Sequence, residues 1–188
     1  MRKTGLKSIY LDYDGVIVNT VETIVSLYNE DFKYYKKFKP VPWYQVYTWD
    51  FSECNCASKK YIDTYFNTPR FFHRLQFMEE CTKDIIYKLR DIYNVKIVSM
   101  GRYANLKLKE EWIEKNLPGI EFVGLDLKKF KDKSSIDMKD GLLLDDNEKM
   151  LFSSNAFEKV CFGDKYGWND GWYGPRLHNW SDVERYLL

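Results

Sequence analysis

With 188 residues, 45% of them hydrophobic, the chain is long enough for one domain or for a small core that carries an inserted segment. A formal net charge of +1 argues against the domain-wide basic excess of many nucleic-acid-binding proteins, and no apolar run is long enough to cross a membrane. No long apolar stretch follows the basic N-terminus, so we expect no signal peptide and a cytoplasmic protein.

The first predicted element is a short buried strand over residues 8–11, where aromatic and aliphatic residues crowd together. It delivers Asp12 and Asp14 to its carboxyl end, and Gly15 lets the backbone turn sharply away. Two carboxylates one residue apart repel each other unless a cation lies between them, and Mg²⁺ is the natural one. A carboxylate beside a divalent ion can also attack phosphorus. The same pattern also occurs in calcium loops and ordinary turns.

A largely helical insert follows, over residues 21–78, and it is unusually rich in aromatic residues. Most of these rings must build the insert's own small core. A few could line a pocket for a flat ligand such as a nucleobase, and the first candidates are Trp49 and Phe71 or Phe72. The four lysines between residues 33 and 39 are most simply a solvated helix face.

Cys54 and Cys56, also in the insert, are one residue apart, but no second cysteine pair and no histidine cluster accompanies them. We therefore expect reduced thiols, of structural or surface type, as is usual in a cytoplasmic protein. A zinc site at this pair is not expected, and the pair's role stays open.

The next predicted elements are a helix over 82–93, with Ile92 on its apolar face, and a strand over 95–99. The strand ends at Ser99, and Met100-Gly101-Arg102 opens a loop before a helix over 105–116. A hydroxyl at a strand end near a helix start can bind a phosphoryl oxygen together with the backbone N–H groups there. A serine in this position is also an ordinary helix cap.

The remaining pattern predicts strands over 120–123, 141–145 and 158–162, with helices over 147–154 and 181–187. Alternating strands and helices are typical of an α/β fold, here a Rossmann-like parallel sheet flanked by helices. The strand over 141–145 ends in Asp145 and Asp146, so a second acidic pair is expected beside the first, outside the carboxyl ends of the strands. The glycine-rich residues 163–175 are predicted as a surface loop that could reach back over the site.

The stretch from Asp12 resembles the first motif, DxDGx(I/V)xxT, of the haloacid dehalogenase (HAD) superfamily of phosphotransferases. The matching residues are Asp12, Asp14, Gly15, Val16 and Thr20. The resemblance implies that Asp12 is the nucleophile that becomes phosphorylated. It also implies that Asp14 is the general acid and base, and that its main-chain carbonyl binds Mg²⁺ together with Asp12.

The other motifs of the superfamily are recognisable in the expected order. Asp145 resembles a Mg²⁺ ligand and Asp146 a supporting residue, while Ser99 resembles the phosphate-binding hydroxyl. Met100, Gly101 and Arg102 would complete the phosphate site, since this loop lacks the second hydroxyl that nucleotidases often have there. The superfamily's lysine has several candidates in residues 128–139. Asp132-Lys133-Ser134 resembles the nucleotidase pattern and favours Lys133, with Lys131 still possible.

The insert lies where this superfamily carries a small helical cap, so we expect a cap over 21–78 and a core over 1–20 and 79–188. The whole chain resembles 5′(3′)-deoxyribonucleotidases. The resemblance implies a Mg²⁺-dependent phosphomonoesterase that dephosphorylates nucleoside monophosphates through an aspartyl-phosphate. A phosphatase for another small phosphomonoester, one for nucleic-acid phosphate ends, and a non-catalytic binding protein are the alternatives. Base, sugar, phosphate position and oligomeric state stay open.

Overall fold

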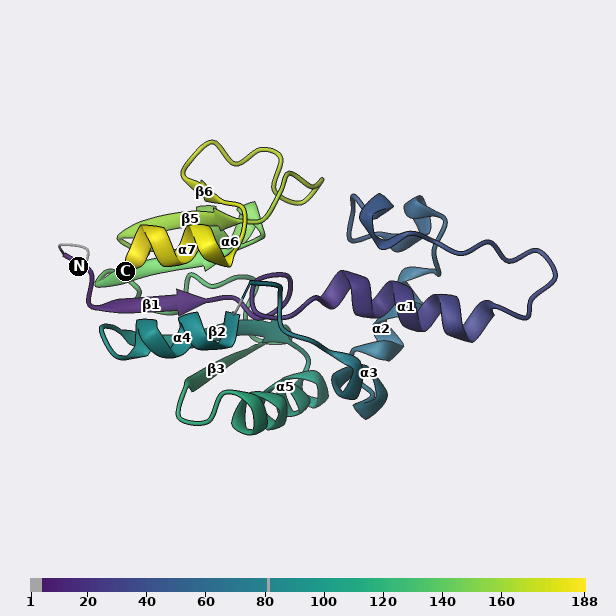
Figure 1. Cartoon of the computed structure of the whole chain (residues 1–188), viewed down its shortest axis with the longest axis horizontal. Helices are drawn as coiled ribbons and strands as arrows, with labels where there is room; N and C mark the ends of the chain where they lie inside the picture. Colours follow the sequence, from purple (N-terminus) through teal and green to yellow (C-terminus); the bar gives the residue numbers. More distant parts are fainter. Residues whose placement is uncertain (1–4, 81) are drawn as a thin grey trace.

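The computed structural model describes residues 5–80 and 82–188, so Cys81 lies outside the described residues. Its centre is one sheet of six parallel strands in the order β3-β2-β1-β4-β5-β6 (Figure 1). The strands are β1 (Ser8–Leu11), β2 (Asn94–Gly101), β3 (Glu121–Asp126), β4 (Gly141–Asp145), β5 (Glu158–Phe162) and β6 (Arg176–Leu177). The predicted α/β fold with a parallel sheet is confirmed.

The register of the sheet brings three strand ends to one edge. Leu11, the last residue of β1, pairs with Ile97 of β2 on one side and with Leu144 of β4 on the other. Every residue of β1 and β4 is buried, as the continuous apolar runs predict for central strands of a parallel sheet. Residues that follow these positions therefore meet at the carboxyl edge.

Four helices cover the sheet. These are α4 (Thr82–Arg90), α5 (Tyr103–Asn116), α6 (Glu148–Ser153) and α7 (Trp180–Leu187). α5 packs against β2 and β3, α6 against β4 and β5, and α4 against β2 and α7. The expected position of Ile92 on the buried face of α4 is wrong, because the helix ends at Arg90 and Ile92 is 37% exposed. No helix in the described ranges is long and apolar enough to cross a membrane.

The structure differs from the predicted elements at one strand boundary and by one additional strand. Strand β2 continues through Gly101, which pairs with Asp126 of β3, so Met100 and Gly101 lie within the strand and not in the predicted loop. Strand β6 was missed, because two residues are too short to show a strand periodicity.

The insert between β1 and α4 projects from the carboxyl edge of the sheet (Figure 1). It contains α1 (Thr20–Phe32), the 3₁₀ turns η1 (Trp43–Gln45) and η2 (Phe51–Cys54), α2 (Lys59–Tyr65) and α3 (Pro69–Arg74). Asp31 on α1 receives hydrogen bonds from Tyr65 and Arg70, at 2.7 Å each, so the helices of the insert are tied together. Its division from the core as a separate cap stays a prediction.

Candidate active site

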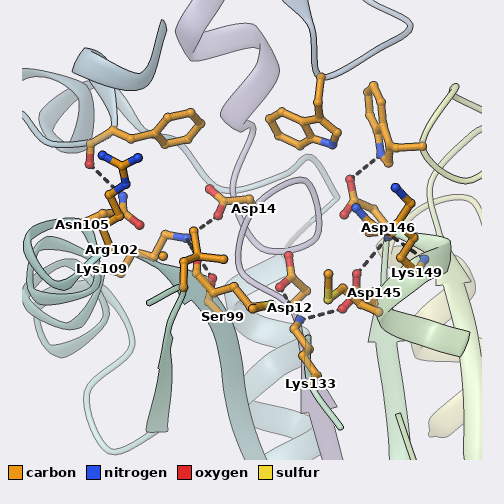
Figure 2. A pocket seen from close by; sticks show the side chains of 18 of the residues that line it. Asp12, Asp14, Ser99, Arg102, Asn105, Lys109, Lys133, Asp145, Asp146 and Lys149 are labelled. Atoms are coloured by element: carbon orange, nitrogen blue, oxygen red, sulfur yellow. Dashed lines mark hydrogen bonds and ion pairs between the residues drawn. The ribbon is translucent and has the colours of Figure 1, made fainter. Parts of the chain in front are cut away.

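A cavity of about 680 Å³ lies between the carboxyl edge of the sheet and the insert, and residues of both line it. Most of the side chains that the sequence singles out line it: Asp12, Asp14, Trp49, Ser99, Met100, Gly101, Arg102, Lys133, Asp145 and Asp146. Figure 2 shows that they reach the cavity from several elements, with Lys109 and Ser99 on one side of Asp12 and the Asp145–Asp146 pair on the other.

Lys133 connects the ends of the two central strands. Its Nζ lies 2.5 Å from Asp12 Oδ1 and 2.6 Å from Asp145 Oδ2, and the side chain is 1% exposed. Burial alone would lower the pKa of Lys133, but the two carboxylates outweigh it and raise the pKa. Lys131 is exposed. Of the two lysines that the sequence left open, Lys133 is therefore the one that reaches Asp12.

Three carboxylates form an acidic cluster beside this lysine. Oxygen atoms of Asp12, Asp145 and Asp146 all lie within 4.8 Å of one another. Burial, helped by Asp145 and Asp14 and opposed by Lys133, raises the pKa of Asp12 to about 7. Burial, followed by the charges of Asp12 and Asp145, also raises the pKa of Asp146 well above its usual range. With all three carboxylates ionised, one lysine would leave the cluster with excess negative charge, and this repulsion adds to burial in raising the two pKa values.

This excess charge and the nature of the donors make the cluster suitable for a divalent cation. All the donor atoms are carboxylate oxygens, which hard cations such as Mg²⁺ prefer. Among residues 5–80 and 82–188, it is the only group of acidic, cysteine or histidine side chains close enough together to hold a metal. Cys54 and Cys56 form no disulfide, and neither belongs to this group.

Asp14 occupies a different environment, because it is held by partners of its own. Thr20 donates a 2.8 Å hydrogen bond to Asp14 Oδ1, and Lys109 contacts Oδ2. The same Lys109 Nζ donates to Ser99 Oγ at 2.8 Å and to the Met100 carbonyl at 3.2 Å. Lys109 therefore links the predicted general acid and base to the predicted phosphate-binding hydroxyl (Figure 2).

Lys109 is a site residue that no sequence motif singled out. It lies on α5 and is 1% exposed, whereas Lys107 on the same helix is exposed. A signal was present, because Lys109 falls four residues after Asn105 and three before Trp112, both of which are buried. A lysine on the buried stripe of a helix needs an acidic partner, and that requirement could have singled it out.

The turn after β1 has little conformational freedom, because its backbone passes close to neighbouring side chains. Gly15 has a φ of +74°, and a Cβ atom there would lie 2.6 Å from Asp146 Oδ2. The buried Trp180 donates from its indole N–H to the Val16 carbonyl at 2.8 Å. The glycine therefore lets the backbone after Asp14 pass close to Asp146, and the hydrogen bond from Trp180 fixes the turn to the core.

Only one of the three aromatic residues that the sequence suggested lines the cavity. Trp49 lines it, but Phe71 and Phe72 do not. Phe71 is fully buried and packs against Phe72 and Phe66 at ring distances of 5.3 Å, so the expectation that these two rings face the ligand is not met. Phe66 and Trp168 line the cavity instead. Trp168 comes from the glycine-rich loop that was predicted to reach back over the site.

The comparisons with known proteins agree with this geometry. The family model described as 5′ nucleotidase, deoxy (pyrimidine), cytosolic type C protein (NT5C) matches residues 7–188. No curated protein matches the chain by sequence.

Solved structures of the HAD superfamily share its fold at low sequence identity. A haloacid dehalogenase-like hydrolase from Streptococcus pneumoniae has a TM-score of 0.64 and 12% identity, with 98% of this chain and 100% of that chain covered. A HAD family hydrolase from Deinococcus radiodurans, with bound phosphate and sodium, has a TM-score of 0.57 and 13% identity over 97% and 94%. The HAD-type protein YfnB from Bacillus subtilis, bound to magnesium, has a TM-score of 0.60 and 12% identity over 100% and 99%.

Proposed function

The chain belongs to the family of 5′ nucleotidases of cytosolic type C and is a phosphoric monoester hydrolase of the HAD type, and we propose that its substrates are nucleoside monophosphates, deoxyribonucleotides in particular. The observation that carries this proposal is a single cavity lined both by the acidic cluster and by Trp49 and Phe66 of the insert. We also propose that the enzyme is Mg²⁺-dependent and cytosolic, with a core over 1–20 and 79–188 and a cap over 21–78.

In the first half of the reaction, a carboxylate oxygen of Asp12 attacks phosphorus while the bond from phosphorus to the nucleoside oxygen breaks. Asp14 gives its proton to that leaving oxygen, so a neutral nucleoside departs and an aspartyl-phosphate remains. Lys109 lies between Asp14 and Ser99. An incoming phosphoryl group therefore gives Lys109 a second anionic partner. The contact between Lys109 and Asp14 then weakens, so that Asp14 can carry the proton.

In the second half, Asp14 removes a proton from a water molecule whose oxygen attacks phosphorus. The bond between phosphorus and the Asp12 oxygen breaks, which restores the Asp12 carboxylate and frees inorganic phosphate. Ser99, Lys133 and the backbone N–H groups at the start of α5 hold the phosphoryl oxygens in both halves, where negative charge is greatest. Arg102, which lines the same cavity, adds a cation near its mouth.

Asp12, Asp145 and Asp146, with the main-chain carbonyl of Asp14, would hold Mg²⁺. Bound there, the ion would neutralise phosphate charge in the transition state. The residues fit this ion because each contributes an oxygen donor and because Lys133 alone does not balance the cluster.

A substrate screen tests the proposal. Purified protein with Mg²⁺ is assayed for phosphate release from ribo- and deoxyribonucleoside 5′- and 3′-monophosphates, from glycerol phosphate and from phosphorylated single-stranded oligonucleotides. We expect kcat/KM for at least one deoxyribonucleotide to exceed that for glycerol phosphate by about tenfold or more, because base stacking contributes about 1–3 kcal/mol. Equal or greater activity on glycerol phosphate would favour another small phosphomonoester, and a preference for oligonucleotides would favour end processing.

A further inference from the structure

The loop between β5 and β6, residues 163–175, places one tryptophan between the acidic cluster and the insert. The indole Nε1 of Trp168 donates a 2.9 Å hydrogen bond to Asp146 Oδ2. The Trp168 ring lies 5.2 Å from the Trp49 ring of the insert, at an interplanar angle of 46°, and Tyr166 stacks on it at 4.6 Å and 4°. One side chain therefore contacts both the predicted metal site and the aromatic wall.

The loop that carries Trp168 is firmly attached to the core. Asn169 is fully buried, and its Nδ2 donates to the Asp146 carbonyl at 2.9 Å. Its own carbonyl accepts a 2.9 Å hydrogen bond from Arg176 Nη2. The Trp168 carbonyl accepts a 3.2 Å hydrogen bond from the Glu148 backbone N–H, at the start of α6. The position of the indole is thus set by the core.

The insert also contacts this loop through its backbone. The Gly167 N–H donates to the Tyr47 carbonyl at 2.7 Å, and a Cβ atom on Gly167 would lie 2.6 Å from that oxygen. Only glycine permits so close an approach without a shift of the backbone. Two residues farther along the insert comes Trp49, so the backbone contact and the ring contact occur side by side.

Since Tyr166 stacks on Trp168 and the Trp49 ring packs beside it, the position of Trp168 is suited to support Trp49. We propose that Trp168 is a positioning residue with two separable effects. Its N–H fixes the Asp146 carboxylate in the acidic cluster, and its ring fixes Trp49 as a wall for the base of the substrate. The first effect rests only on the proposed Mg²⁺ site, whereas the second also rests on the proposed nucleotide substrate.

Three variants separate the two effects. Trp168→Phe keeps a ring beside Trp49 and removes the N–H, whereas Trp168→Ala removes both. The matched control is Trp172→Phe in the same loop, because the Trp172 N–H donates to the Pro175 carbonyl and its ring packs against Phe152, away from Asp146 and the insert. Circular dichroism checks folding, and Trp168→Leu replaces the alanine variant if that one does not fold.

Binding of Mg²⁺ and of Ca²⁺ is measured by calorimetry without substrate, and kcat and KM are then measured at saturating Mg²⁺. We expect Trp168→Phe to weaken Mg²⁺ binding about tenfold, in line with the loss of an outer-shell partner, and to change nucleotide KM less than threefold. Trp168→Ala should also raise nucleotide KM about tenfold and leave glycerol phosphate KM unchanged. Trp172→Phe should change neither quantity.

Unaltered Mg²⁺ affinity in Trp168→Phe would overturn the first effect. An equal rise of KM for both substrates in Trp168→Ala would overturn the second. If the unmodified enzyme hydrolyses no nucleotide, the proposed function fails and the second effect fails with it, while the calorimetric result still decides the first effect.

Discussion

The acidic edge of the sheet and the insert hold their functional side chains by different means. At the sheet edge, Lys133 and Lys109 are buried and each makes several short polar contacts that join elements far apart in the sequence. In the insert, rings such as Tyr34 and Tyr44 are 85% and 68% exposed, and Trp49 reaches the cavity through contacts with other rings. This difference fits the proposal that the core edge carries the chemistry and that the insert selects the substrate.

If this comparison holds, the largest effect comes from the core edge. Asp12→Asn should lower turnover by about 10⁴-fold or more, because a neutral amide cannot attack phosphorus. Lys133 keeps Asp145 as a partner, so the fold should survive. Phosphate release and circular dichroism measure the two quantities. Activity above a trace in a folded variant would show that Asp12 is not the nucleophile.

Removal of the metal should have the next largest effect. A chelator should abolish activity and added Mg²⁺ should restore it, whereas Asp145→Ala should require at least about tenfold more Mg²⁺ for half-maximal activity. Asp170→Ala, which removes an exposed carboxylate from a surface ion pair, is the matched control and should behave like the unmodified enzyme. Full activity in excess chelator would contradict the assigned role of the acidic cluster.

Substitution of Lys109 tests whether contacts between elements distant in the sequence matter for the chemistry. Lys109→Met keeps the length of the side chain but removes the contacts to Asp14 and Ser99, and we expect kcat to fall about 10²-fold with KM changed less than threefold. Lys107→Met on the exposed face of α5 is the control and should leave both constants unchanged. A rise in KM with unchanged kcat would assign Lys109 to substrate binding alone.

The smallest effects on catalysis should come from the insert. Trp49→Ala should raise nucleotide KM about ten- to a hundredfold with little change in thermal stability, because base stacking is worth about 1–3 kcal/mol. Phe71→Ala should instead lower the free energy of unfolding by about 3–5 kcal/mol, since this ring is fully buried. Urea unfolding measures the stability of both variants, and kinetics on a nucleotide and on glycerol phosphate measures their KM values. Equal changes on both substrates for Trp49→Ala would make its ring structural.

The central strands and their acidic ends could be predicted from the sequence, because the information is local. A continuous apolar run followed by acids, with a glycine after the first pair, marks Asp12, Asp14, Asp145 and Asp146, and the rules of parallel sheets bring the ends of neighbouring strands to one edge. The α/β fold follows from the same alternation of strands and helices. The roles of these residues in catalysis stay predictions until the variants are measured.

The tertiary structure alone decided which neighbours the buried polar side chains meet. Periodicity indicates that a residue is buried, but not what lies opposite, since Lys109 meets Asp14 across 95 residues and Lys133 meets Asp12 across 121. For the same reason Trp49 and Phe71 have the same aromatic character in the sequence, yet one lines the cavity and the other fills the space between helices. Contacts between distant segments depend on how the elements pack together, and the spacing of residues along the chain does not contain that information.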